Sequence, residues 1–282
     1  MVFRDTLLAL TTHPEPTPAP AVIEAIEFAA AIGARISAIA CEIEFPVPGS
    51  FLADLVLDLP AMAAAEAKKS SADAEELLRI FQGAAEDRGA FAERILEHGL
   101  TLDVPGLLSE YARLRDLTIV PMPEGPYGDE RYAEAIIFGS GRPTLVIPHT
   151  RKQAGHFALN TVVVAWDFSR AAARALADAL PILEQTKDVR VVTISHEKAL
   201  DASQSAAAVS KHPGDPRTYR RPDSVDAAGR DIGDVLESYV ASCNADLLVM
   251  GAFGHSRVRD FILGGATKSM LARPPLPVLL SH

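Results

Sequence analysis

The chain has 282 residues, of which 48% are hydrophobic and 23% charged, a globular composition with enough material for two ordinary domains. With a net charge of −10 the surface as a whole repels nucleic acid and anionic membranes, so neither is expected as a partner. No apolar run approaches the roughly 20 residues that cross a bilayer, and no signal-peptide pattern opens the chain. The two cysteines, Cys41 and Cys243, form neither a disulfide framework nor a metal cluster. We therefore expect a cytoplasmic protein without a protein-bound metal site.

An internal repeat organises the predicted elements. Two apolar strand-like segments in the first half recur in the second half at an offset of 155 residues, and an Ala-rich helical stretch lies between them in each half. Two later segments recur at offsets of 130 and 131 residues. The pairs are 6–10 with 161–165, 35–39 with 190–194, 116–120 with 246–250, and 142–146 with 273–278.

The fall in offset from 155 to about 131 places about 24 extra residues in the middle of the first half. Two stretches are candidates for this insertion: residues 45–59 and a predicted long helix over residues 61–88. The insertion could cover a pocket or bind a partner.

The predicted strands are rich in Val, Ile and Leu without alternation, which is typical of strands buried on both faces. Because strands alternate with helices, each half is predicted to be an α/β, Rossmann-like, doubly wound open parallel sheet of five strands. We expect domains at 1–150, with the insertion around 45–88, and at 157–282, joined by a polar linker at 149–156. The final strands, 144–147 and 277–280, can meet across a pseudo-twofold axis within the chain. Dimerisation of whole chains is left open.

A glycine-rich segment follows the third strand of the repeat in the second half. Gly251 and Gly254 come directly after that strand, and Gly264 and Gly265 open a predicted helix that runs to about Ala272. Glycines allow a backbone to approach phosphate closely, and a helix start offers free N–H groups and a positive dipole end. The segment therefore favours phosphate binding over the simpler interpretation of a tight turn and a glycine-rich helix start.

Ligands of open parallel sheets bind beyond the carboxyl ends of the strands, which extends the candidate site to further residues. Asp167 could accept hydrogen bonds from a ribose or an adenine, or act as a turn residue before the next helix. Trp166 could flank a base or pack in the core, and His255 could contact phosphate or face solvent. The complete set of predicted nucleotide-binding residues is Ala165, Trp166, Asp167, Ile194, Met250, Gly251, Gly254, His255, Gly264, Gly265, Ala266 and Thr267.

Two familiar nucleotide-binding motifs are absent from the sequence. No Gly-x-Gly-x-x-Gly follows a first strand, and no Gly-x-x-x-x-Gly-Lys-Ser/Thr occurs. His255, Arg257 and Asp260 are polar, but their spacing indicates no pairing of a base with a nucleophile. We expect no enzyme, with slow ATP hydrolysis at most as an incidental activity.

These residues resemble the universal stress protein family in its tandem two-domain form. Gly251, Gly254 and Gly264 fit that family's spacing of Gly, two residues, Gly, nine residues, Gly, and Asp167 fits its Asp at the end of the first strand. The segment 275–280 resembles the family's last strand, through which two domains pair. The resemblance is specific over about 161–282 and only topological over 1–150. It implies a stress-response regulator or adaptor that binds adenine nucleotide, ATP with or without Mg²⁺, in the second domain.

Two departures from the family pattern alter this expectation. Gly265 stands where the family has Ser or Thr, so a hydroxyl for phosphate is missing, although Thr267 or Ser256 could replace it. A charge-assisted hydrogen bond contributes about 1.5–3 kcal/mol, so its loss weakens ATP about ten- to hundredfold. In the first half, an offset of 155 places Thr12 opposite Asp167, and Pro121 and Glu124 follow the third strand. Residues 138–141 are at best a remnant of a glycine loop, and the first half is expected to bind no ATP.

Two alternatives stay open on sequence alone. Gly265 and the degenerate first half are compatible with a scaffold or small-ligand receptor that binds no nucleotide. An enzyme such as a nucleotidyl transferase or ATP pyrophosphatase is disfavoured, because neither half has a Ser-Gly-Gly-x-Asp-Ser or His-x-Gly-His loop after its first strand.

Overall fold

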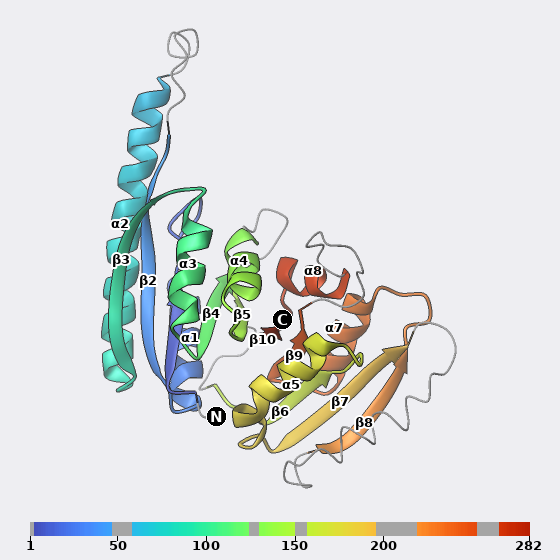
Figure 1. The fold of residues 1–282 in the computed structure, drawn as a ribbon. Coiled ribbons are helices and arrows are strands. Elements are labelled where there is room, and N and C mark those ends of the chain that lie inside the picture. Colours follow the sequence, from blue (N-terminus) through green and yellow to red (C-terminus); the bar gives the residue numbers. More distant parts are fainter. Residues whose placement is uncertain (1–2, 47–57, 124–129, 150–156, 196–218, 253–264) are drawn as a thin grey trace.

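The computed structural model describes residues 3–46, 58–123, 130–149, 157–195, 219–252 and 265–282. In these residues strands alternate with helices along most of the chain, as the sequence predicted, and one strand directly follows another at two places (Figure 1). The first half holds β1 (Asp5–Ala9), α1 (Ala19–Ala31), β2 (Arg35–Glu44), α2 (Leu59–Asp87), β3 (Phe91–Leu100), α3 (Val104–Arg113), β4 (Leu117–Met122), α4 (Arg131–Gly139) and β5 (Thr144–Pro148). The second holds β6 (Thr161–Ala165), α5 (Arg170–Leu183), β7 (Asp188–Ser195), β8 (Tyr219–Asp226), α7 (Ile232–Ser242), β9 (Leu247–Gly251), α8 (Gly265–Ala272) and β10 (Val278–Ser281).

The strands form one ten-stranded sheet in the order β3-β2-β1-β4-β5-β10-β9-β6-β7-β8. Every neighbouring pair is parallel except β5 and β10, which are antiparallel. Each half therefore contributes a five-stranded parallel sheet with the same strand order, read inward from its outer edge. The α/β fold class and the tandem arrangement predicted from the sequence are confirmed.

The junction between the halves is symmetric in its register. Leu145 of β5 pairs with Leu279 of β10, and the flanking pairs are Thr144 with Leu280 and Val146 with Val278. Pro143 and Pro277 make the same hydrogen bond in the two halves, each carbonyl accepting from an N–H of the neighbouring strand. Leu145 and Leu279 are therefore equivalent residues, and the pseudo-twofold axis passes between them.

Hydrogen bonds also fix which residues of the two halves correspond. The Leu10 N–H donates to the Ile39 carbonyl at 2.9 Å, and the Trp166 N–H donates to the Val192 carbonyl at 2.8 Å. Leu10 thus corresponds to Trp166, an offset of 156, and Ile39 to Val192, an offset of 153. The single offset of 155 therefore aligned these strands of the two halves incorrectly. Runs of similar apolar residues can be aligned equally well one or two residues apart. Asp167 consequently corresponds to Thr11, and Thr12, which the sequence placed opposite Asp167, corresponds to Phe168.

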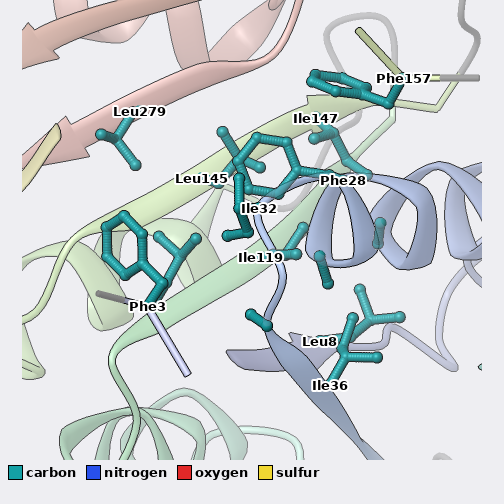
Figure 2. Close-up of a cluster of buried hydrophobic side chains, with 14 of the residues drawn as sticks. Phe3, Leu8, Phe28, Ile32, Ile36, Ile119, Leu145, Ile147, Phe157 and Leu279 are labelled. Carbon is teal, nitrogen blue, oxygen red and sulfur yellow. The ribbon is translucent and has the colours of Figure 1, made fainter. Parts of the chain in front are cut away.

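Helices cover both faces of the sheet, and their apolar sides form two cores. One core contains residues of α1, α2 and α5, and the other contains residues of α3, α4, α7 and α8. The first core crosses the junction: Phe28 of α1 contacts Phe157 edge to face at a centroid distance of 5.1 Å. Figure 2 shows this pair together with Leu145 and Leu279. Fully buried side chains such as Phe28 each stabilise the fold by about 1.5–3 kcal/mol.

The insertion of the first half lies between β2 and β3. The offset is 153 at Ile36, which corresponds to Val189, and 128 at Phe91, which corresponds to Tyr219, so 25 extra residues separate these strands. Much of this length is the 29-residue helix α2, confirming the predicted long helix. Its buried residues run from Ser70 to Ala85, whereas its first turns extend with the end of β2 beyond the rest of the sheet (Figure 1). Among the described residues, no helix is long and apolar enough to span a membrane.

Candidate functional site

Three helices of the second half begin where its strands end. Ser169 caps α5, its Oγ accepting from the Ala172 N–H at 3.0 Å. Asp231 caps α7, its Oδ1 accepting from the Gly233 N–H at 2.8 Å. Helix α8 begins at Gly265. The helix dipoles place three partial positive charges along the edge of the sheet formed by the carboxyl ends of its strands. This arrangement favours the binding of an anion.

The turn between β6 and α5 presents Asp167 to solvent. Asp167 Oδ1 accepts from the Ser169 N–H at 2.9 Å, so the turn role considered for this residue is realised. In the described part of the chain, its second carboxylate oxygen has no hydrogen-bond partner and can accept from a ligand. Phe168, which lies between Asp167 and Ser169, is 52% exposed and adopts a φ of 63°. This backbone conformation costs a non-glycine residue about 1–3 kcal/mol.

Gly251 is required by the packing of β9 against α5. A Cβ at this position would lie 2.5 Å from the Ala172 nitrogen and 2.6 Å from the Ala171 carbonyl carbon. Both are backbone atoms of a helix and cannot move aside. The glycine therefore brings the end of β9 next to the N-terminus of α5, and this role is independent of any ligand.

Gly265, by contrast, is exposed and sterically free. Among the described residues, a Cβ here would meet only Asp231 Oδ2, at an ordinary contact distance of 3.6 Å. The described residues therefore leave room for the Ser or Thr side chain that the family has at this position. Thr267, considered as its replacement, is only 2% exposed, and Ala266 packs partly buried against the second core. Because Thr267 and Ala266 are buried or partly buried, the backbone N–H of Gly265 is the group at the described start of α8 that can contact a phosphate.

Asp231 was not found by sequence reasoning, yet its carboxylate faces the start of α8. The helices α7 and α8 approach closely at Gly233, where a Cβ would lie 2.5 Å from the Ser269 Cβ. This contact brings the capping carboxylate of one helix beside the first residue of the other. An Asp before a predicted helix is an N-cap signal, but only the packing shows that its negative charge lies at the candidate phosphate position.

The three strand-end residues Ala165, Ile194 and Met250 pack on the α7 and α8 side of the sheet. Met250 is buried, and Ala165 and Ile194 are partly buried. Trp166 packs against the core on the opposite side, so the structure supports the core role considered for it. It also contacts the exposed Phe168 edge to face at 5.7 Å. Gly254, His255 and Gly264 lie outside the described residues.

The corresponding edge of the first half is filled by its own side chains. Ser70 of α2 shares a 2.8 Å hydrogen bond with Thr12, and its Oγ accepts from the Ile43 N–H at 3.1 Å. The Thr12 hydroxyl also donates to the Cys41 carbonyl at 2.7 Å. Thr11, which corresponds to Asp167, is tied to Thr17 by a hydroxyl contact of 2.9 Å.

The glycines of the first half also serve a different purpose. Gly139 and Ser140 end helix α4, and Gly141 follows with a φ of 66°. A helix C-terminus carries partial negative charge, so this segment cannot replace a phosphate loop. Pro121, an internal residue of β4, occupies the position of Gly251.

Neither cysteine is prepared for nucleophilic chemistry. Burial, with a smaller contribution from Glu97, raises the pKa of the Cys41 thiol to about 12. Burial also raises the pKa of Cys243. Within the described ranges, no group of three His, Cys, Asp or Glu side chains could hold a metal ion.

Comparisons with known proteins agree with this geometry. The sequence model of the universal stress protein family matches residues 159–282. A universal stress protein from Archaeoglobus fulgidus DSM 4304 superposes with a TM-score of 0.71 at 16% identity, covering 98% of this chain and 97% of that one. A putative universal stress protein from Pseudomonas aeruginosa UCBPP-PA14 gives a TM-score of 0.58 at 11% identity, covering 99% and 93%. No curated protein matches the chain. The full-length matches show that both halves share the fold.

Proposed function

Since residues 159–282 belong to the universal stress protein family, we propose that this domain binds adenine nucleotide, ATP, and that the chain is a cytoplasmic regulator or adaptor in stress responses. The observation that carries the proposal is the convergence of helix N-termini on an edge where Asp167 stays exposed. In this proposal the nucleotide acts as a regulatory ligand, and any hydrolysis is incidental.

In this proposal each part of the edge contacts one part of ATP. Asp167 accepts from the ribose or adenine through the carboxylate oxygen that the turn leaves unused. The phosphates lie at the start of α8, where Gly265 contributes its N–H and the helix dipole favours negative charge. Ala165, Ile194 and Met250 form the apolar floor beneath the nucleotide.

Asp231 determines the charge balance at the phosphates. Its Oδ2 lies 3.6 Å from the Cβ position of Gly265 and would repel an uncompensated triphosphate. Magnesium is held in proteins by one or two carboxylates together with substrate phosphates. We therefore propose Mg²⁺ as the counter-ion that accompanies ATP at this edge, beside Asp231.

The chain offers its own reporter for the test, because Trp166 is the only tryptophan in the sequence and lies next to Asp167. Titration of the full-length protein with MgATP is expected to change the Trp166 fluorescence in a saturable way. The Asp167→Asn variant keeps an oxygen for the turn but replaces the second acceptor with an amide donor. We expect it to weaken ATP about ten- to hundredfold, the value of a hydrogen bond to a charged group.

Asp226 provides a matched control. It is also exposed, and its Oδ1 accepts from the Ala228 N–H at 2.9 Å in the same kind of turn, but it ends the outer strand β8. Asp226→Asn should bind MgATP like the wild type. Absence of saturable binding to the wild type, by fluorescence and calorimetry, would refute nucleotide binding. Equal weakening in both variants would refute the role of Asp167.

A second candidate is a scaffold of the same fold that binds no nucleotide. The observation that favours it is the Asp231 carboxylate at the start of α8, where it already compensates the helix dipole. In this case the wild type shows no fluorescence change with ATP, with or without Mg²⁺.

A further inference from the structure

The two outer strands of the sheet differ in how well they are protected against pairing. β3 and β8 end the ten-stranded order, so each has one side that pairs with no other described strand (Figure 1). β8 contains Pro222, which lacks an N–H donor, and four of its eight residues are charged. Prolines and charges on an edge strand oppose pairing with another chain. β3 is ten residues long and contains no proline, so its outer side can accept a further strand.

Apolar side chains of β3 are exposed along this edge. Leu96 is 39% exposed and Leu100 is 41% exposed, and Leu102, which follows the strand, is exposed as well. Side chains alternate along a strand, and Ile95 packs against the core that contains α3. Leu96 and Leu100 therefore share the opposite face, the side of α1 and α2. Their exposure shows that α2 leaves the outer part of that face uncovered.

The chain already joins two copies of this fold edge to edge. β5 and β10 pair antiparallel about the pseudo-twofold axis, and the equivalent residues Leu145 and Leu279 lie opposite each other. Two identical β3 strands from two chains can pair in the same way, because a twofold contact uses the same surface on both copies. Antiparallel pairing keeps every side chain on its own face, so the residue that lies on the axis fixes all the other pairs.

The charges of β3 favour one residue for the axis. With Leu96 opposite itself, nine residues of each strand pair, 92–100, and each glutamate lies opposite an uncharged residue. An axis at Ile95 or Glu97 would place glutamates opposite one another, and an axis at Arg94 would oppose two arginines. Like charges directly opposite each other destabilise a pair of strands. The sequence of β3 is therefore complementary to a second copy of itself in the register centred on Leu96.

The basic residues of β3 are compatible with this register. Arg94 lies opposite His98 of the second copy, and the imidazole of His98 is bound to the Glu42 carboxylate of its own chain. The arginine thus meets a histidine that is already paired with a carboxylate. An axis at His98 would pair only five residues of the strand, 96–100, so it offers fewer backbone hydrogen bonds.

We propose that β3 is the interface between two copies of this chain, paired antiparallel with Leu96 on the twofold axis. The two Leu96 side chains contact each other there, and the sheet continues through both chains. The second halves then lie toward the two far ends of the joined sheet. This interface gives the first half, whose own carboxyl edge is filled, a role in assembly. It does not depend on nucleotide binding, so its test is separate from that of the proposed function.

The first experiment measures the mass of the full-length protein by light scattering and sedimentation at up to about 100 μM. We expect the wild type to show twice the mass of one chain. Leu96→Lys places two ammonium groups opposite each other and removes the apolar contact, so it should weaken the dimer about hundredfold. Leu114→Lys is the matched control, because Leu114 is an exposed leucine at the end of α3, away from this edge. It should dimerise like the wild type, and circular dichroism verifies that both variants fold.

Cysteine cross-linking tests the register in a Cys243→Ser background, where the remaining native thiol, Cys41, is buried. Leu96→Cys is expected to form a disulfide between chains under mild oxidation, since Cβ atoms directly opposite lie about 4.5–5.5 Å apart. Leu100→Cys is the control. Leu100 is equally exposed, but its two copies would lie about 27 Å apart along the strands and should not cross-link.

Three results would overturn the proposal. A wild type that stays monomeric over the whole concentration range would remove the interface. A dimer that survives Leu96→Lys, or that Leu114→Lys weakens equally, would place the contact on another surface. Cross-linking of Leu100→Cys as readily as Leu96→Cys would refute the register centred on Leu96.

Discussion

The carboxyl ends of the strands are used differently in the two halves of this molecule. In the first half, Ser70 of the inserted helix α2 bonds to Thr12 and to the backbone of β2, so the polar groups of that edge are satisfied internally. In the second half, the corresponding turn leaves Asp167 and Phe168 exposed. The same strand order is therefore compatible with two arrangements at the carboxyl ends of the strands. In the first half the polar groups named above bond to one another, and in the second half a hydrogen-bonding group is left exposed.

The difference arises from local packing, since the strand order is the same in both halves. The insertion between β2 and β3 supplies the long helix whose Ser70 reaches the end of β1. Pro121 of β4 removes a backbone donor at the position where Gly251 allows close approach. The comparison teaches that a repeated fold loses a site by filling it and not by changing its framework, and four predictions test this view.

The largest effect is expected at Gly251. Gly251→Val would place side-chain atoms within 3 Å of the α5 backbone, so we expect a loss of about 3 kcal/mol or more in the free energy of unfolding. Urea unfolding followed by circular dichroism measures it. Gly265→Ala, a glycine in the same candidate site without such a contact, should stay within about 0.5 kcal/mol of the wild type. Equal stability of the two variants would contradict the packing role of Gly251.

The next effect concerns Cys41 and the pH dependence of stability. The pKa of its thiol is raised by burial to about 12, whereas an unfolded cysteine ionises near 8.5. Between these values the folded state holds more protons than the unfolded state, so stability falls as pH rises. At pH 10 this amounts to about 2 kcal/mol relative to low pH.

Urea unfolding of the wild type and Cys41→Ala at pH 7.5 and pH 10 isolates this contribution. The wild type should lose about 2 kcal/mol more than the variant over this interval. Cys243→Ala is the control from the second half, because the pKa of Cys243 is raised in a less buried position and its removal should matter less. A wild type that loses no more stability than Cys41→Ala would show that the thiol is accessible to water.

Ser70→Ala should cost about 1–2 kcal/mol, because it leaves the buried Ile43 N–H without its acceptor. Thermal unfolding of this variant can be compared with Ser238→Ala in α7, whose exposed hydroxyl donates to the Asp234 carbonyl of its own helix. The control is expected to stay within about 0.5 kcal/mol of the wild type. Unchanged stability of Ser70→Ala would mean that the first edge is not held closed by this residue.

The sequence was sufficient for the framework of the fold. Five strands were predicted in each half, and the repeated apolar segments located eight of the ten. The remaining two, β3 and β8, were not located because they lie at the outer edges of the sheet. The burial of β3 alternates, and β8 reads Tyr-Arg-Arg-Pro-Asp-Ser-Val-Asp, so neither forms an apolar run. The register of the repeat was wrong by one to three residues in three of its four segments, since only backbone hydrogen bonds distinguish neighbouring apolar positions.

The site was predicted less completely, because its chemistry depends on contacts between distant segments. The spacing of glycines indicated where a phosphate could bind, but it could not show that Gly251 is already required by α5. Asp231 carried only the N-cap signal of an Asp before a predicted helix. Its position beside Gly265 follows from a helix-to-helix contact, which no local pattern of residues encodes.

The smallest expected effect concerns the negative charge of Asp231 beside the start of α8. Asp231→Asn keeps an oxygen that can cap α7 but removes the negative charge beside Gly265. In EDTA, where no cation compensates the phosphates, we expect ATP to bind about three- to tenfold tighter, equivalent to about 0.7–1.4 kcal/mol. With Mg²⁺ present, the carboxylate helps to hold the cation, so the gain should shrink or reverse.

Calorimetry in EDTA and in Mg²⁺ separates these two roles of the carboxylate, and Asp234→Asn is the control. Asp234 is an exposed carboxylate in the first turn of the same helix, so it tests whether any nearby negative charge has the same influence. Equal tightening in both variants would assign the effect to general charge, and no tightening in either would remove Asp231 from the phosphate position. A gain confined to Asp231→Asn and to EDTA would show that the second edge stays usable only when a cation offsets its own carboxylate.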